Sequence, residues 1–231
     1  MQHVSSALSM ATCSTFRKRH RASAERQLGA GVDTLTAMRA LTTLTQGAPA
    51  AAAILALMLI ASLAALYAAP QILDRHLLRP YWLLPRRQWV TVITSGFLHA
   101  DLPHLLFNGF TFWTFGFSLE RVIGTPTFVA LYAFGLLVSS AGTWLAHRQQ
   151  PEYASLGASG AILAVLFASI VYTPAQSIFI FPIPLPIPAP LFALLYLGFT
   201  FYASRQAARG RINHDAHLSG ALAGVVFVLL T

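Results

Sequence analysis

The sequence predicts an all-α membrane protein with six transmembrane helices, and three observations support this fold class. Of its 231 residues, 56% are hydrophobic and only 10% are charged, whereas a soluble domain usually carries about a quarter charged residues. No Asp, Glu, Lys, Arg or His occurs between Ala154 and Ser204. Several further uncharged stretches approach the roughly 20 residues that a helix needs to cross the hydrocarbon core of a bilayer.

Residues 1–46 form a polar tail ahead of the first of these stretches. The tail contains the basic cluster 17–21 and the only cysteine, Cys13, so no intrachain disulfide is possible. Its content of Arg and Ser is typical of a targeting peptide, and its polarity also fits a disordered cytoplasmic tail. A third interpretation is a mis-called start, with Met38 as the first residue. We expect the activity to reside in one six-span domain, residues 47–231.

The predicted spans follow in order along this domain. The first is rich in Ala and Leu and ends at Pro70. A long loop, 70–103, then combines Arg with aromatic residues, a mixture typical of a segment at headgroup depth. Polar loops separate most of the later spans, and a short basic loop, 205–213, precedes the last one. The six predicted spans are 50–69, 102–119, 127–146, 157–172, 191–203 and 212–231.

The connection between the fourth and fifth spans carries proline at alternate positions from Pro182 to Pro190. Alternating prolines prevent a helix and favour an extended path. An SH3-type ligand has a similar pattern, but the Ile and Leu residues between these prolines favour a connector at the lipid edge.

The formal net charge of +8 is consistent with an anionic partner. The basic residues fall in the tail and the loops without an aromatic-basic platform, which argues against nucleic acid and favours lipid headgroups. In a six-span protein, the side with both termini carries six basic residues of the tail plus Arg121, and the other side carries eight. The Lys and Arg bias therefore leaves the orientation open.

Polar residues within the predicted spans are costly unless they are paired, so they are candidates for a functional site. Ser159 lies between Gly157 and Gly160, which permit a sharp turn and leave room for another helix. A serine in a transmembrane helix usually bonds to its own backbone instead. His217 is followed by Gly220 and Gly224 on a face that permits a close helix crossing.

Packing of this glycine face against the fourth span would bring His217 to Ser159. A neutral imidazole that is hydrogen-bonded to a hydroxyl can act as its base. The alternative is a helix-packing seam that contains a hydrogen-bonded histidine. Asp215 is two residues from His217, and positions i and i+2 of a helix point apart. We therefore expect Asp215 to have a loop or capping role.

His104 and Asn108 are four residues apart and share one face of the second span. Two hydrogen-bond donors that converge near a serine can stabilise the oxyanion of a tetrahedral intermediate. The alternative is a polar pair that ties this span to a neighbouring helix. His99, His104, His214 and His217 could in principle form a zinc site. The chain has no His-Glu-x-x-His motif and no cysteine pair, so we expect no metal and no cofactor.

Five short motifs occur in a fixed order along residues 50–231, and in this order they resemble the rhomboid intramembrane serine proteases. Each motif alone is weakly specific, whereas five in the expected spans are strongly specific. The motifs are Gly96-Phe97-Leu98-His99, His104-Leu105-Leu106-Phe107-Asn108, Gly116-Phe117-Ser118-Leu119-Glu120-Arg121-Val122-Ile123-Gly124, Gly157-Ala158-Ser159-Gly160 and Ala216-His217-Leu218-Ser219-Gly220.

The resemblance implies a six-helix bundle with a Ser159–His217 dyad and no triad acid. It implies an oxyanion hole formed by His104, Asn108 and the backbone amide of Ser159, and a structural role for His99. The substrates would be single-span membrane proteins, cut near the membrane edge. The site would open to the outer face of a bacterial inner membrane, with the N-terminus in the cytoplasm. The fifth span and the loop 205–213 would move to admit the substrate.

The chain departs from the family pattern at two places. A Trp-Arg pair of the long loop is replaced by Arg87-Gln88-Trp89-Val90. The tyrosine that often follows the catalytic serine by one helical turn is Leu163, so the residue that packs against the base stays open.

The sequence leaves two other functions and one other location as alternatives. The first alternative is an inactive relative that binds or escorts membrane proteins. The second is a transporter, which the absence of a repeat and of a central acidic residue argues against. The Arg- and Ala-rich tail makes a mitochondrial membrane the alternative location.

Overall fold

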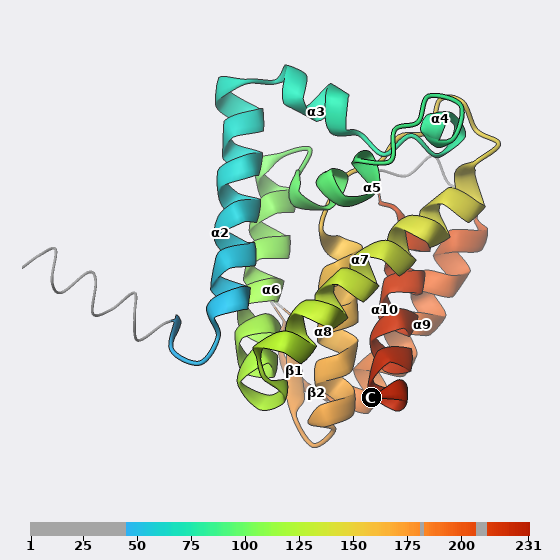
Figure 1. The fold of residues 1–231 in the computed structure, drawn as a ribbon. Helices are drawn as coiled ribbons and strands as arrows, with labels where there is room; N and C mark the ends of the chain where they lie inside the picture. The colour runs from blue at the N-terminus through green and yellow to red at the C-terminus, as the bar shows by residue number, and fades with distance from the viewer. Residues whose placement is uncertain (1–44, 181–182, 207–211) are drawn as a thin grey trace, which may run out of the picture. The chain divides into compact units, whose positions relative to one another are not determined.

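The computed structural model describes residues 45–180, 183–206 and 212–231. Within these ranges, Gly47–Thr231 form one compact helical unit (Figure 1). The predicted tail lies almost wholly outside the described residues, so its separation from the domain near residue 46 stays a prediction. The same holds for the middle of the basic loop 205–213, because residues 207–211 are not described.

The described residues contain six longer helices, and each one overlaps a predicted span. The first helix, α2, continues directly into a π-helical turn, η1 (Ala64–Ala68). Two stretches have both the length and the hydropathy of membrane spans, Pro49–Ala68 and Thr125–His147. The helical fold class is therefore confirmed, while the count of six spans stays a prediction. The six helices are α2 (Pro49–Leu63), α6 (Leu102–Ile123), α7 (Thr125–His147), α8 (Ser159–Tyr172), α9 (Ala189–Arg205) and α10 (His214–Leu230).

Helix α8 lies at the centre of this unit. Every residue from Gly160 to Ile170 is buried, which agrees with a helix that is apolar on all sides. Helices α6, α7 and α10 contact α8, α2 packs beside α6, and α9 packs mainly on α10 (Figure 1). Because α8 carries no charged residue, it can be surrounded by these three neighbouring helices. Ser159 at its start therefore lies among them.

Three short helices and one 3-10 turn occupy the long loop at the end of the unit where α6, α8 and α10 begin (Figure 1). Two contacts of Trp82 stabilise this loop. Arg86 makes a cation–π contact with its ring, 3.7 Å from the centroid, and its Nε1 donates a hydrogen bond to the Pro151 carbonyl. A backbone bridge pairs Leu78 with Ser155. The loop elements are α3 (Gln71–His76), α4 (Pro80–Leu83), α5 (Thr91–Thr94) and η2 (Ser95–Phe97).

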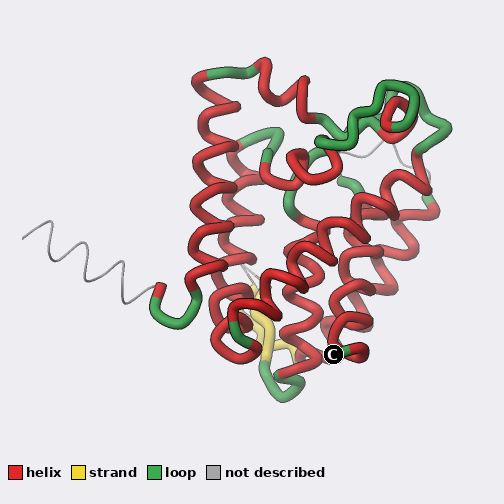
Figure 2. The backbone as a smooth tube through the Cα atoms, in the orientation of Figure 1, coloured by secondary structure: helices red, strands yellow, loops and turns green. Residues whose placement is uncertain are grey.

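The connection between α8 and α9 is a β-hairpin at the opposite end of α8 (Figure 2). Strands β1 (Ser177–Ile180) and β2 (Ile183–Pro188) pair in antiparallel register. The extended path is confirmed, but the hairpin was not predicted, and it makes the fold not strictly all-α. The prolines occupy alternate positions of β2, so their missing N–H groups lie along one edge, and the other edge keeps its donors for β1.

A buried carboxylate joins the end of α6 to the start of α2. Glu120 is fully buried and accepts hydrogen bonds from the N–H groups of Ala50 (3.0 Å) and Ala51 (2.6 Å) and from the Thr125 hydroxyl. Glu120 therefore caps the free N–H groups of α2 from another helix, where a negative charge also complements the helix dipole.

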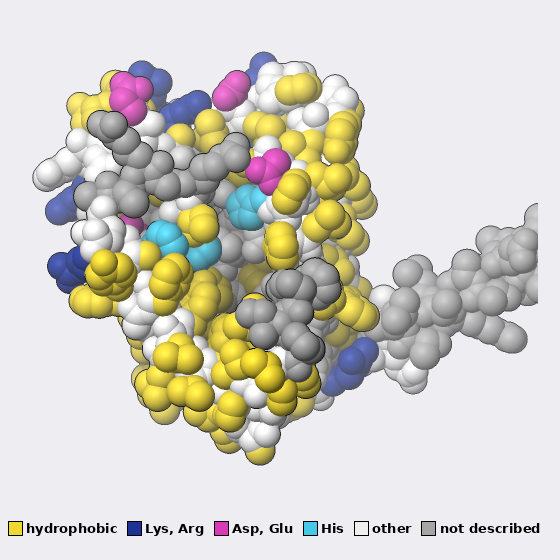
Figure 3. Space-filling model, turned by 180° about the vertical axis from the view of Figure 1, so that it is seen from behind, with side chains coloured by type: hydrophobic (Ala, Val, Ile, Leu, Met, Phe, Trp, Pro, Cys, Tyr) yellow, Lys and Arg dark blue, Asp and Glu magenta, His cyan; other side chains and the backbone are white. Residues whose placement is uncertain are grey.

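Hydrophobic side chains cover much of the lower part of the unit in Figure 3, and charged side chains gather mostly toward the upper part. Many large apolar residues of α6 and α9 are exposed, among them Phe107, Phe110, Leu194 and Phe199. An apolar surface of this extent is typical of a protein that contacts lipid.

Candidate active site

Ser159 and His217 lie at the ends of two neighbouring helices. Ser159 is the first residue of α8, and His217 is in the first turn of α10. The Ser159 Oγ is 2.8 Å from the Nε2 of His217, the distance of a strong hydrogen bond. In the tautomer that leaves Nε2 unprotonated, the hydroxyl donates to the imidazole, which is the arrangement that a serine nucleophile and its base require.

Glycines bring these two helices close enough for the contact. A Cβ atom at Gly220 would overlap the carbonyl oxygen of Gly160, and a Cβ atom at Gly224 would overlap the carbonyl oxygen of Ala164. The backbones of α8 and α10 therefore approach more closely than any residue with a side chain permits. The predicted small-residue face of α10 is the face that contacts α8, and this close crossing places His217 beside Ser159.

His104 lies against the loop that leads into Ser159. Gly157 has a φ of +133°, and a Cβ atom there would be 2.8 Å from the Cε1 of His104. The N–H of Gly157 donates to the carbonyl of Ser95, at 2.9 Å. Only glycine combines this backbone conformation with this space, so Gly157 brings the His104 ring beside the start of α8.

Asn108 lies one helical turn beyond His104 on α6. Its side chain is buried, and its Nδ2 has no hydrogen-bond partner among the described residues. A buried amide donor without a partner is rare in proteins and calls for an explanation. A developing oxyanion beside Ser159 would supply the missing acceptor.

His99 packs against the ring of His104. The two rings meet edge to face at 4.9 Å, and the His99 Nδ1 is 2.9 Å from the Ser62 hydroxyl. That hydroxyl donates to the Phe97 carbonyl, so Nδ1 of His99 carries a proton and donates to Ser62. Burial, together with the nearby His104, lowers the pKa of His99 to about 3, which keeps this histidine neutral at physiological pH.

The second ring nitrogen of His217 contacts a tyrosine that sequence analysis missed. Nδ1 of His217 is 3.1 Å from the hydroxyl of Tyr196 on α9. Tyr196 lies in an uncharged span with many aromatic residues, and no motif or spacing singles it out.

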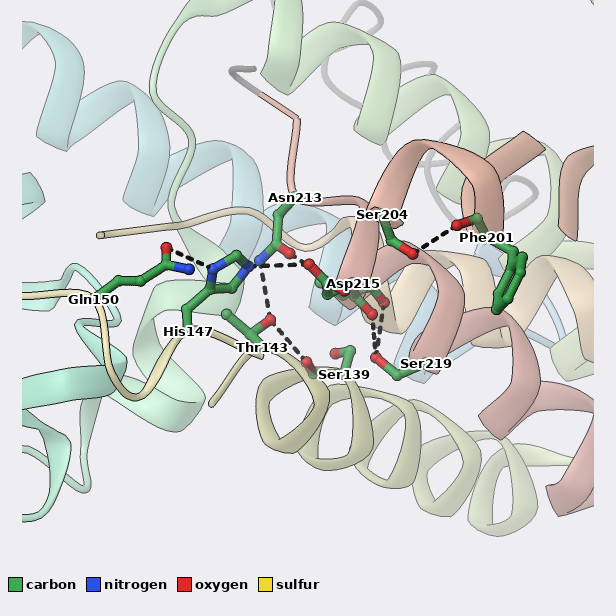
Figure 4. Close-up of polar contacts among 10 residues, drawn as sticks. Ser139, Thr143, His147, Gln150, Phe201, Ser204, Asn213, Asp215 and Ser219 are labelled. Carbon is green, nitrogen blue, oxygen red and sulfur yellow. Dashed lines mark hydrogen bonds and ion pairs between the residues drawn. The ribbon is translucent and has the colours of Figure 1, made fainter. Parts of the chain in front are cut away.

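Among the described residues, no hydrogen bond joins Asp215 to His217. The Asp215 carboxylate instead lies 3.0 Å from Nε2 of His147, and Figure 4 shows this contact. The ring of His147 is largely buried at the end of α7 and stacks on Tyr153, with ring centroids 3.6 Å apart. Asn213 caps α10 by accepting from the Ala216 N–H, and its amide donates to Thr143. These contacts fix the first turn of α10, which carries His217, onto the end of α7.

A small cavity of about 30 Å³ adjoins Ser159. Its wall includes several hydroxyl groups, and its volume is sufficient for one water molecule. No group of three His, Cys, Asp or Glu side chains suited to a metal ion occurs in the described part of the chain. The polar residues of the cavity wall are Ser95, Ser139, Ser140, Thr143, Ser155, Ser159 and Asn213.

Comparisons with known proteins all indicate the same family. Residues 86–231 match the Rhomboid domain. The chain is 31% identical over 164 residues to Rhomboid protein 1, mitochondrial, of Saccharomyces cerevisiae, which covers 65% of this chain and 45% of that protein. It is 30% identical over 148 residues to the Presenilin-associated rhomboid-like protein A, mitochondrial, of Danio rerio, with coverages of 59% and 36%.

A bacterial relative shows a similar level of identity. The chain is 27% identical over 142 residues to the Rhomboid protease GluP of Bacillus subtilis, with coverages of 62% and 26%. The chain thus spans between about a quarter and a half of the length of these three relatives. All four polar residues singled out in the predicted spans fall within the matched residues 86–231.

Proposed function

The chain belongs to the rhomboid family, and on this premise we propose that it is an intramembrane serine endopeptidase that cleaves single-span membrane proteins near the membrane edge. The observation that carries the proposal is the 2.8 Å contact between Ser159 Oγ and His217 Nε2. This contact joins a nucleophile to a base in a unit whose surface is largely apolar.

The proposed reaction is acyl transfer to Ser159. The Ser159 Oγ attacks the scissile carbonyl carbon while its proton passes to Nε2 of His217. The resulting oxyanion accepts hydrogen bonds from His104, from Asn108 and from the N–H of Ser159. When the intermediate collapses, the C–N bond breaks, and His217 gives its proton to the leaving amine.

Water completes the reaction by hydrolysing the acyl-enzyme. His217 removes a proton from the water, the hydroxide attacks the acyl carbon, and the Ser159 Oγ leaves and recovers a proton from His217. The hydroxyl-lined cavity beside Ser159 supports this step, because it can hold a water molecule next to the acyl group. No step requires a cofactor.

The proposed topology has six spans, with the N-terminus in the cytoplasm of a bacterial cell and the site near the outer face of the inner membrane. The similarity to a Bacillus subtilis protein supports a bacterial location. The similarity to two mitochondrial proteins supports a mitochondrial membrane as the second candidate location.

The test is cleavage of a fluorescent single-span membrane protein by the purified chain in liposomes. Wild type should cleave it, and Ser159→Ala and His217→Ala should not. Ser204→Ala is the matched control, because Ser204 lies on α9 and bonds to the Phe201 carbonyl; it should retain activity. Cleavage that survives in Ser159→Ala and His217→Ala would rule out the dyad.

A second assay separates the protease from an inactive rhomboid-like binding protein. A fluorophosphonate reacts with an activated serine without any peptide substrate, so wild type should be labelled and Ser159→Ala should not. Folded wild type that binds the membrane protein but shows neither cleavage nor labelling would support the binding function instead.

A further inference from the structure

We propose that Tyr196 is a positioning residue that holds the imidazole of His217 in its reactive orientation and tautomer. The inference rests on the proposed function and extends it to a residue on α9. The hydroxyl of Tyr196 takes the place that a carboxylate has in a Ser-His-Asp triad.

The two nitrogens of His217 have different partners, which decides the direction of both hydrogen bonds. Nε2 faces the Ser159 hydroxyl at 2.8 Å, and Nδ1 faces the Tyr196 hydroxyl at 3.1 Å. A neutral imidazole carries one N–H and one lone pair. A base that accepts the proton of Ser159 needs its lone pair on Nε2, so Nδ1 carries the hydrogen and donates it to the oxygen of Tyr196.

Carboxylates of α10 do not provide this acceptor. The carboxylate of Asp215 pairs with His147 at 3.0 Å, and a helix turns positions i and i+2 away from each other. His214 lies one turn earlier on α10, but its ring centroid is 6.1 Å from that of His217, the two rings are at 77° to each other, and no hydrogen bond joins them among the described residues. Tyr196 is the hydrogen-bond partner that the described residues place at Nδ1.

Aromatic packing holds Tyr196 in place without its hydroxyl. Its ring stacks on Phe192, with centroids 5.6 Å apart, and meets Phe167 of α8 at 5.8 Å. One turn further along α9, the buried hydroxyl of Thr200 interacts with the hydroxyl of Tyr196. This hydroxyl is a suitable acceptor for the proton of Tyr196 while the oxygen of Tyr196 accepts from Nδ1.

Tyr196 also connects His217 to α9, a helix that contributes none of the other residues of the site. Ser159, His217, His104 and Asn108 come from α8, α10 and α6, whereas Tyr196 comes from α9. Only Ala189 and Thr200 of α9 are buried, so most of this helix lies at the surface of the unit. Any displacement of α9 from α10 removes the second hydrogen bond of the base.

The first experiment compares Tyr196→Phe with Tyr202→Phe in the full-length chain. The Phe at 196 keeps the ring packing and removes only the hydroxyl, and Tyr202 is a largely exposed tyrosine of the same helix. For the fluorescent single-span protein, we expect kcat to fall about tenfold in Tyr196→Phe with KM unchanged. The rate of labelling by a fluorophosphonate should fall by a similar factor.

Two readouts separate positioning from a general structural role. The acidic limb of the pH profile of kcat/KM should move to lower pH in Tyr196→Phe, because the imidazolium loses a hydrogen-bond acceptor. The thermal unfolding temperature should match that of wild type. An unchanged kcat, or the same loss of kcat in Tyr202→Phe, would overturn the proposal.

The second experiment does not depend on activity. Nitrogen NMR of ¹⁵N-histidine-labelled protein, with His217→Ala to assign the signals, reports which nitrogen carries the proton. We expect the Nδ1–H tautomer in wild type and a mixture in Tyr196→Phe. An Nε2–H tautomer in wild type, or identical tautomers in both proteins, would contradict the proposal. A wild type that neither cleaves nor reacts with the fluorophosphonate would refute the proposed function alone, since the tautomers would still be measured.

Discussion

At the scale of single residues, the candidate site contains buried polar groups that have no partners among the described residues. Asn108 is the clearest case, because its buried Nδ2 has no partner among the described residues. Folding gains nothing from such a donor, whereas the transition state of an acyl transfer would use it. Unpaired donors of this kind distinguish a reactive site from a polar pair that only ties helices together.

Replacing Asn108 with Leu should lower kcat about 100- to 1,000-fold, the cost of removing one oxyanion donor. The substitution keeps a similar volume and removes a buried Nδ2 that has no partner among the described residues, so the protein should be at least as stable as wild type. Steady-state cleavage and thermal unfolding in detergent would measure both effects. A loss of activity that parallels a loss of stability would instead identify Asn108 as a structural residue.

His99 should make the stability of the protein depend on pH. Its pKa is about 3 in the folded protein and about 6.5 in an unfolded chain. Between these values the unfolded state binds the proton and the folded state does not, so stability falls as the pH decreases from 6.5 toward 3. The His99→Asn variant should lose less stability than wild type across this window, as measured by thermal unfolding at pH 7, 5 and 4.

The His99→Asn comparison isolates this histidine, because carboxylates that titrate in the same range are common to both proteins. Asn can still donate to the Ser62 hydroxyl, which keeps the bond that His99 makes. Identical pH dependence in the two proteins would show that His99 is protonated without cost in the folded state.

At the scale of elements, the crossing of α8 and α10 decides whether the dyad forms. A Cβ atom at Gly220 would overlap the carbonyl oxygen of Gly160, and a backbone atom can move aside only if the whole helix moves. We therefore expect Gly220→Ala to cost about 1–3 kcal/mol of stability and to separate His217 from Ser159. Cleavage and fluorophosphonate labelling should both be lost.

Gly198 of α9 provides the matched control for this substitution. No atom lies within 4 Å of a Cβ placed there, and alanine is favoured over glycine inside a helix by about 1 kcal/mol. Gly198→Ala should therefore leave activity unchanged and raise stability slightly. Equal activity in Gly220→Ala and Gly198→Ala would mean that the close crossing is not required.

The helices of this unit could be predicted from the sequence because long uncharged stretches are almost sufficient to identify them. The strands could not, since the alternating prolines between Pro182 and Pro190 indicate an extended path but not its partner. The contacts of Asp215 with His147 and of Glu120 with α2 join residues about 70 positions apart, and no local pattern reveals them. Tyr196 was missed for a related reason: an apolar helix does not indicate which face it turns to its neighbours.

At the scale of the whole molecule, the ends of α8 relate the chemistry to the membrane. Ser159 begins this helix, at the end where the long loop and the starts of α6 and α10 gather, and the β-hairpin follows its other end. The six-span proposal therefore predicts that the loop before α8 and the turn after it face opposite sides of the membrane. Charge counting could not decide this, because the basic residues are divided almost equally.

Labelling with a membrane-impermeant maleimide would test this arrangement. The only natural cysteine is Cys13, so Cys13→Ser gives a background without cysteine. Gln149 and Ala175 are exposed and lie before and after α8. In intact bacterial cells whose outer membrane has been permeabilised, Gln149→Cys should be labelled, whereas Ala175→Cys should react only after lysis. Labelling of both before lysis, or of Ala175→Cys alone, would contradict a site that opens to the outer face, because α8 would then not cross the bilayer in the direction that the mechanism requires.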